Sequence, residues 1–284
     1  MNRVSWIAVT LFGAVFIASF FIEGHAALFM NASALLIVIC GTLGALFLSY
    51  PAADMLAALR VTVNLSRHTP MTAQQAIDAI LDIAMQTRSK GILALESMSE
   101  QVTIGFLKRA LGLLVDGFKD DELSDFLHAE MLHFKQRRAQ FERMFRQAAL
   151  YAPAFGVAGS VIGLINMLAG ITDPDVILKT MPVALTSPLY GIVLANSIFF
   201  PIAEGIHTKT QKELLILKLI ADGVVILRHE PNPKRLAIKL ESFLTPAARS
   251  HENRSLEEIR RHLRDLRKET EAPQRARAFV REQA

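Results

Sequence analysis

The sequence has a single cysteine, Cys40, and little charge, with Asp, Glu, Lys and Arg making up 20% of 284 residues. One cysteine excludes a scaffold held by disulfides. Four windows lack these four charged residue types entirely, and they cover residues 5–22, 27–50, 147–172 and 181–203. Because a helix needs about 20 mostly apolar residues to cross a bilayer, the sequence predicts an all-α integral membrane protein with four transmembrane helices. A soluble globular enzyme and a disordered chain are excluded as the default interpretation.

The positive charges lie almost entirely on one side of the predicted spans. Lys179 is the only Lys or Arg between the third and fourth windows, and residues 23–26 between the first two windows contain none. Since cytoplasmic flanks carry the excess of Lys and Arg, both termini and the 51–146 stretch are predicted to be cytoplasmic. These flanks also explain the net charge of +4, so no nucleic-acid partner is expected.

The predicted organisation has five parts. The 51–146 stretch shows helical periodicity, for example at Ile77, Ile80 and Leu81, and at Phe126, Leu127, Met131 and Phe134. We therefore expect a cytoplasmic helical domain inserted between the second and third spans. The parts are a transmembrane hairpin (1–50), the cytoplasmic helical domain (51–146), a transmembrane pair (147–204), cytoplasmic helices (205–246) and a charged C-terminal tail (247–284).

The third and fourth windows differ from the first two by their content of Gly, Pro, Ser, Thr and Asn. Small residues let helices approach closely, and a proline frees the carbonyl four residues earlier. Such segments pack on other helices or line a polar path, and composition alone leaves both open. No Asp or Glu lies at mid-depth in any of the four windows. If the protein conducts ions, a partner must therefore supply the intramembrane carboxylate.

The sequence contains no nucleophile–base constellation, no metal-ligand spacing and no Gly-rich phosphate loop. Its eight histidines are scattered along the chain and are interpreted as surface residues. We therefore expect no enzyme activity, no metal site and no cofactor. Both a channel and a non-conducting membrane scaffold remain compatible with this pattern.

Several short motifs resemble the MotA/PomA flagellar stator subunits, which are relatives of ExbB and TolQ. The resemblance extends from about Trp6 to Pro246, and the combination of motifs is more specific than any one of them. The motifs are Gly-Thr-Leu-Gly-Ala at 41–45, Ala-Pro-Ala-Phe-Gly at 152–156, Ile-Gly-Leu-Ile-Asn-Met-Leu at 162–168, Leu-Tyr-Gly at 189–191, Pro-Ile-Ala at 201–203 and Asn-Pro-Lys-Arg-Leu at 232–236.

The resemblance implies a homo-oligomer, a pentamer of A subunits around two single-pass B subunits of the MotB/PomB type. The B helix carries the ion-binding Asp, which agrees with the missing carboxylate here. Ion flow across the bacterial inner membrane drives rotation of the A ring, whose cytoplasmic helices push the rotor protein FliG. The chain is then an ion-conducting stator subunit rather than an enzyme.

The resemblance also assigns roles to individual residues. Pro153 and Pro201 match the two prolines that couple ion flow to movement, and Tyr190 matches a position beside the ion path. Arg88 and Glu96 match the charged pair that faces the rotor. By sequence alone these two residues fit an ordinary solvated helix face, so their rotor-facing role depends on the resemblance. Lys90 is a further candidate on the same surface.

The transported ion is expected to be a proton, with sodium as the alternative. Sodium-type relatives have threonines at three positions that read Ser160, Ser187 and Pro188 here. One hydroxyl is therefore lost, and a dehydrated cation needs more oxygen ligands than a proton does. Pro188 would free the carbonyl of Ala184, which could substitute as a ligand.

An ExbB/TolQ-type energiser of outer-membrane transport is the alternative within the same superfamily. Those proteins typically have three membrane spans and an N-terminus outside the cytoplasm. The four predicted spans, with a tight hairpin between the first two, favour the stator subunit.

Overall fold

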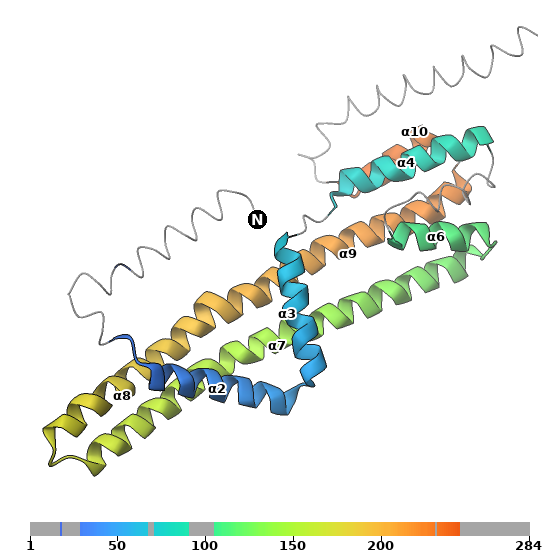
Figure 1. Cartoon of the computed structure of the whole chain (residues 1–284). Helices are drawn as coiled ribbons and strands as arrows, with labels where there is room; N and C mark the ends of the chain where they lie inside the picture. Colours follow the sequence, from blue (N-terminus) through green and yellow to red (C-terminus); the bar gives the residue numbers. More distant parts are fainter. Residues whose placement is uncertain (1–17, 19–28, 68–70, 91–104, 231, 245–284) are drawn as a thin grey trace, which may run out of the picture. The chain divides into compact units, whose positions relative to one another are not determined.

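The computed structural model describes residues 18, 29–67, 71–90, 105–230 and 232–244, and every regular element in these ranges is helical (Figure 1). The predicted all-α class is confirmed. In chain order the elements are α2 (Ala32–Ser49), α3 (Ala52–Arg67), α4 (Ala73–Lys90), α6 (Gly105–Val115), α7 (Asp120–Ala169), α8 (Pro174–Leu194), the π-helix η2 (Ala195–Phe199), α9 (Phe200–His229) and α10 (Pro233–Glu241).

Three helical stretches in the described residues are long and apolar enough to cross a membrane. They are α2, α7 and the continuous stretch Pro174–His229, which joins α8, η2 and α9. The predicted span at 5–22 lies outside the described residues, so the count of four spans stays a prediction. The third predicted span lies in the C-terminal part of α7, and the fourth lies in α8, η2 and the start of α9. Helices α7 and α9 both continue from these spans into charged sequence.

The chain divides into two compact units. Unit 1 comprises Met1–Thr69 and Lys135–Gln211, and unit 2 comprises Pro70–Phe134 and Lys212–Ala284. Helices α7 and α9 contribute residues to both units.

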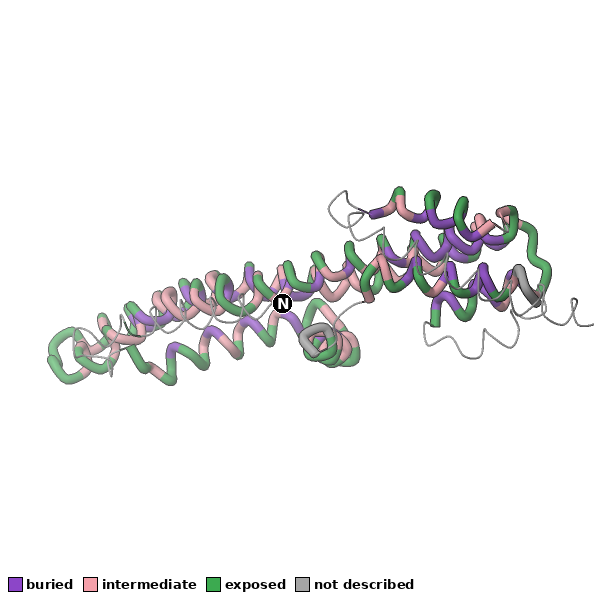
Figure 2. Tube along the Cα trace, turned by 90° about the horizontal axis from the view of Figure 1, so that it is seen from above, coloured by how far each residue is buried: buried purple, intermediate pink, exposed green. Residues whose placement is uncertain are grey.

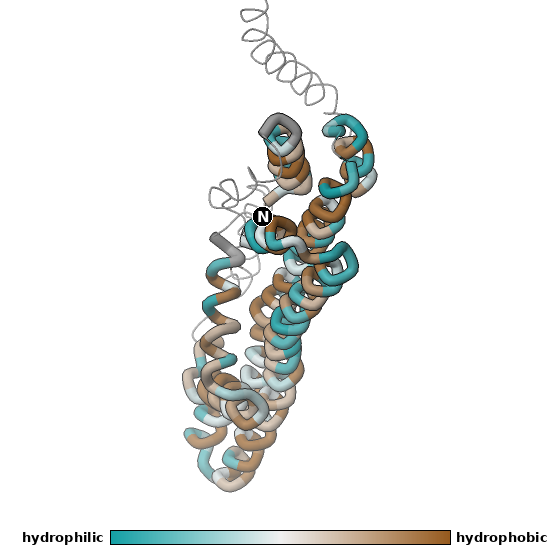
Figure 3. Tube along the Cα trace, turned by 90° about the vertical axis from the view of Figure 1, so that its right-hand side faces the viewer, coloured by the Kyte–Doolittle hydropathy of each residue, from teal (hydrophilic) through white to brown (hydrophobic). Residues whose placement is uncertain are grey.

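In unit 1, α2 buries one residue per turn, which gives a stripe of Ala34, Val38, Thr42 and Leu46. Many large apolar side chains of α2, α7 and α8 stay exposed, including Leu36 and Leu168. The hairpin made by the end of α7 and by α8 is accordingly hydrophobic over much of its surface (Figure 3). An apolar outer surface is typical of helices whose solvent is lipid.

In unit 2, α4, α6 and α10 pack with the N-terminal part of α7 and the C-terminal part of α9 around one apolar core (Figure 2). Its largest fully buried side chains are Ile77, Ile80, Leu107, Leu111, Leu123, Leu127, Leu219, Ile220, Leu236 and Leu240. Ile77, Ile80 and Leu81, which follow the predicted helical period, lie in helix α4 and are buried in this core. In α7, Leu127 is buried while the adjacent Phe126 is 49% exposed.

The unit 2 core predicts a strong effect of shortening Leu111, which is 0% exposed. Leu111→Ala should lower the free energy of unfolding by about 2–5 kcal/mol, because it removes buried methyl groups and leaves a cavity. Thermal unfolding of the detergent-solubilised complex checks this. Leu132→Ala, at a position that is 53% exposed, is the control and should change stability by less than about 0.5 kcal/mol.

Candidate functional site

Helices α7 and α8 approach each other at backbone distance within unit 1. Gly156, Gly159 and Gly163 recur at spacings of three and four residues and therefore share one face of α7. A Cβ atom added to Gly163 would lie 2.7 Å from the backbone nitrogen of Ala184 in α8. One added to Gly159 would lie 2.5 Å from Oγ of Ser187. No side chain larger than hydrogen fits at these positions unless the helices separate.

The contact is reciprocal, because α8 also presents a glycine to α7. A Cβ atom on Gly191 would lie 2.5 Å from the carbonyl oxygen of Ala152 and 2.8 Å from Cα of Pro153. Gly156 faces the carbonyl oxygen of Ser187 and Cα of Pro188 in the same way. The structure thus brings Pro153, Ser187 and Pro188 into one interface, although it does not test the roles expected for them.

Helix α2 packs on the same region through small residues of its own. The ring of Phe155 in α7 fills the space beside Gly41, where a Cβ atom would lie 2.2 Å from the ring. A methyl carbon of Ile37 is 3.2 Å from the Cβ position of Gly159. The Gly-Thr-Leu-Gly-Ala motif therefore supplies close helix contact.

Two hydroxyl groups are buried without a hydrogen-bond partner among the described residues. They are Oγ of Ser187, whose residue is 0% exposed, and Oγ1 of Thr42, which is 1% exposed. An unpaired buried hydroxyl costs about 1–3 kcal/mol, so such groups mark places where a water, an ion or a partner can bind. Ser160 is half-buried beside Gly159. Thr42 was not predicted, because a threonine in an apolar window carries no distinguishing sequence signal.

The hydroxyl of Tyr190, unlike those of Ser187 and Thr42, has hydrogen-bond partners among the described residues. Its hydroxyl donates to the carbonyl of Phe29 and accepts a hydrogen bond of 2.8 Å from the backbone nitrogen of Asn31. Asn31 in turn caps α2, since its side chain accepts from the backbone nitrogen of Ala34. In the described residues, Tyr190 thus ties α8 to the start of α2.

Pro201 lies in the first turn of α9, immediately after the π-helix η2, and is exposed. A proline inside a helix cannot donate a hydrogen bond, and its ring collides with the carbonyl four residues earlier. The helix is widened directly before it, with the backbone nitrogen of Phe200 donating to the carbonyl of Ala195. The side-chain amide of Asn196 donates to the carbonyl of Ile192 at 2.9 Å. Single π-turns of this kind are frequent at functional sites.

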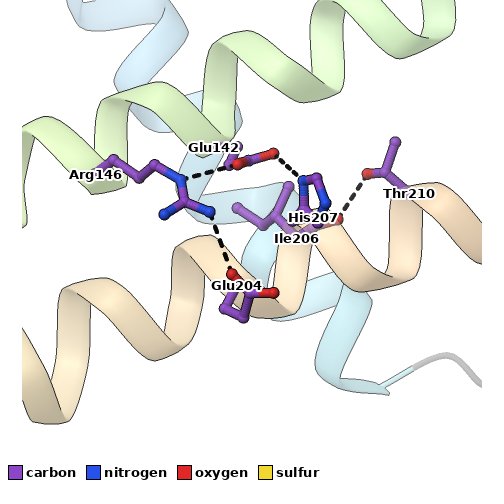
Figure 4. Close-up of polar contacts among 6 residues, drawn as sticks. All are labelled: Glu142, Arg146, Glu204, Ile206, His207 and Thr210. Atoms are coloured by element: carbon purple, nitrogen blue, oxygen red, sulfur yellow. Dashed lines mark hydrogen bonds and ion pairs between the residues drawn. The ribbon is translucent and has the colours of Figure 1, made fainter.

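A polar cluster joins α7 to α9 in unit 1 (Figure 4). The carboxylate of Glu142 binds Nε of Arg146 and Nδ1 of His207, each at 2.9 Å. Arg146 also reaches Glu204, with a distance of 3.2 Å between the two charged groups. One turn further along α9, the hydroxyl of Thr210 donates to the carbonyl of Ile206 in its own helix. These residues lie outside the charge-free windows.

The cluster sets the ionisation of its members. Partial burial acts to raise the pKa of Glu142, but hydrogen bonds from His207 and Arg146 outweigh it, so the pKa of this carboxyl lies below its ordinary value. The hydrogen bond to Glu142 raises the pKa of the Arg146 guanidinium. Glu142 is therefore an ionised acceptor, and Nδ1 of His207 carries the proton between them.

Sequence reasoning missed this cluster. His207 was expected to be a plain surface residue, whereas it is half-buried and bound to Glu142. Glu142 and Arg146 are one helical turn apart, so this pair could have been found from its spacing. The links to α9 join residues 58 and 65 positions apart in the chain, and no local pattern reports them.

Two of the expected rotor-facing residues, Arg88 and Lys90, lie in the last turn of α4. The side chains of both lie outside what the structure describes, as does Glu96 entirely. Their expected role stays a prediction from the resemblance.

The comparisons with known proteins agree with the geometry of the described residues. Residues 98–218 match the family model of the MotA/TolQ/ExbB proton channel family. The chain is 29% identical over 248 residues to motility protein A of Borreliella burgdorferi, covering 86% of this chain and 94% of that protein. It is 29% identical over 239 residues to chemotaxis protein PomA of Vibrio alginolyticus, covering 84% and 94%. The solved flagellar MotAB stator complex of Bacillus subtilis matches with a TM-score of 0.74 at 27% identity, over 85% of this chain and 97% of that one.

Long apolar helices, packed through glycines and with buried hydroxyls that lack a partner among the described residues, are typical of a helical membrane protein. The chain is similar to the MotA/TolQ/ExbB proton channel family over residues 98–218 and to flagellar stator A subunits over most of its length. The proteins that it resembles are a channel family and motility proteins rather than enzymes.

The glycine contact predicts that one added methyl group at Gly191 separates α7 from α8. Gly191→Ala should destabilise the protein by about 1–3 kcal/mol, because its Cβ atom would overlap backbone atoms that cannot turn away. Gly44→Ala is the matched control within α2, since no atom lies within 4 Å of that Cβ position. The control should be neutral or more stable by up to about 1 kcal/mol. Thermal unfolding of the detergent-solubilised complex distinguishes the two.

Proposed function

We propose that this chain is the A-type stator subunit of a bacterial flagellar motor and couples ion flow to rotor torque. The observation that carries the proposal is similarity over most of the chain to motility protein A and PomA, together with the match to the Bacillus subtilis MotAB stator. These relatives are motility proteins, which favours the stator function over an ExbB/TolQ-type energiser.

A B subunit of the MotB/PomB type is the proposed partner. The four charge-free windows contain no carboxylate that could bind an ion inside the membrane. Instead, Ser187 in the α7–α8 interface and Thr42 in α2 carry buried hydroxyls without a partner among the described residues. An apolar helix surface with buried hydroxyl groups supports a mechanism in which the Asp of a B-subunit helix binds and releases the ion. Pro153 and Pro201 then couple that event to movement.

The proposed assembly is a homopentamer around two B subunits in the bacterial inner membrane, with four spans and both termini cytoplasmic. The one-sided distribution of Lys and Arg supports this orientation. The rotor protein FliG is the proposed cytoplasmic partner, and Arg88, Lys90 and Glu96 are the proposed contacts.

A proton is the proposed ion, with sodium as the alternative. Ser187 and Ser160 keep two of the three hydroxyl positions of sodium-type relatives, and Pro188 replaces the third. The loss of one oxygen ligand weakens coordination of a dehydrated cation more than transfer of a proton.

Expression of this chain with a B subunit should restore swimming to a bacterium that lacks its own stator genes. The same B subunit with its intramembrane Asp changed to Asn is the control and should restore none, because the ion-binding group is lost. Swimming speed should collapse on addition of a protonophore and stay constant when external sodium is replaced by potassium. Speed that follows external sodium instead identifies sodium as the ion, and an assembled but motionless complex contradicts the stator function.

Reversal of the proposed rotor-facing charges should reduce torque. Arg88→Glu and Glu96→Lys each turn an attraction into a repulsion across the interface, so swimming speed should fall while membrane levels of the protein stay unchanged. An opposite reversal on the rotor surface should restore part of the speed. Equal speed for the wild type and both variants would remove these residues from the rotor contact. Immunoblots of membranes and swimming assays measure the two quantities.

A further inference from the structure

We propose that Glu142 is a positioning residue that, with Arg146, Glu204 and His207, forms a polar clasp fixing α7 against α9. In the stator function proposed above, on which this inference rests, the clasp transmits motion from one helix to the other. None of these residues lies in the charge-free windows or among the expected coupling residues.

The geometry makes Glu142 the centre of the clasp. Its side chain is 17% exposed, and its two carboxylate oxygens bind different partners. Oε1 accepts from Arg146 on its own helix, and Oε2 accepts from His207 on α9. Arg146 then crosses to Glu204, so two separate links join the helices about one turn apart. Charge-assisted bonds with such partners are stronger and more directional than neutral ones.

The apolar contact beside the clasp does not by itself set the register of the helices. Met144 and Phe145 of α7 pack there with Ala203 and Ile206 of α9. Apolar packing is non-directional, and Ala203 offers only a methyl group. The hydrogen bonds of Glu142, whose side chain is 17% exposed, are directional and so favour one register over its neighbours, a role attested for buried polar groups.

The clasp also stands next to the two places where the helices are weakened. Pro153 follows Arg146 by about two turns and removes a backbone hydrogen bond from α7. On the other helix, η2 and Pro201 interrupt the regular ladder just before Glu204. Bending concentrates at such interruptions. With the clasp closed, a bend at one proline must be accompanied by a movement of the facing helix, and this joint movement is the transmission that we infer.

Torque measurements on single motors test the clasp. The chain is expressed with its B subunit in a host without stator genes, and a bead on the flagellar stump reports speed. Stepwise speed changes count the stator units in each motor and give the torque per unit. The variants are Glu142→Gln, His207→Ala and their combination. Arg143→Gln is the matched control, because Arg143 is an exposed cation on the same helix.

We expect each single variant to assemble in normal numbers and to lose torque per unit by about twofold or more, as residues of one network do. The double variant should lose no more than the larger single loss, because both changes break the same link. His207→Ala leaves Glu142 paired with Arg146, so it preserves folding if Glu142→Gln does not. Arg143→Gln should match the wild type.

Three outcomes overturn the clasp. They are unchanged torque per unit in variants that assemble, additive losses in the double variant, and an equal loss in Arg143→Gln. A purely structural role would reduce the number of units and leave the torque of each unit unchanged. If the wild-type chain itself drives no rotation, the proposed function fails together with the clasp. Rotation by the wild type with unchanged torque in the variants refutes the clasp alone.

Discussion

The structure of unit 1 depends on one constraint, which is that α7 and α8 touch through their backbones. In lipid there is no hydrophobic driving force between helices, so association relies on close packing. Gly159 and Gly191 provide it, because their Cβ positions fall 2.5 Å from atoms of the facing helix. Pro153 and Ser187 come into one interface only because these glycines allow it. A larger residue on either side would separate the groups whose proximity the proposed function uses.

This close packing also explains why charged side chains are absent from the α7–α8 interface and lie instead outside the charge-free windows. The α7–α8 interface is uncharged and too tight for a charged side chain at its glycines. The hydroxyls of Ser187 in this interface and of Thr42 in α2 have no partner among the described residues. The proposed function therefore takes its ion-binding carboxylate from a B subunit. The charged residues Glu142 and Arg146 follow the opposite rule. They lie before the charge-free window, where each charge meets an opposite one.

The sequence predicted what depends on local pattern and failed where partners are distant. Charge-free windows and helical periodicity are local patterns, so three apolar spans in the described residues and the helix that contains Ile80 agree with the sequence. The period alone did not say which of the adjacent residues Phe126 and Leu127 faces the core, and only packing decides that Leu127 is buried. Tyr190 could not be assigned locally, since its hydrogen bonds reach residues about 160 positions away. The contacts of Glu142 with α9 were missed for the same reason.

The two kinds of contact in unit 1 have complementary mechanical properties. The glycine faces bring α7 and α8 to backbone distance, and the close contacts at Gly163 and Gly191 leave no room for a side chain there. The link between Glu142 and His207 joins α7 to α9 through a directional polar contact. Breaking this link would leave a partly buried carboxylate without one of its donors. In the proposed function the helices must line an ion path and also move together. The glycine contacts serve the first need and the polar cluster around Glu142 serves the second. Along the chain, Pro153 and Pro201 lie between these two kinds of contact.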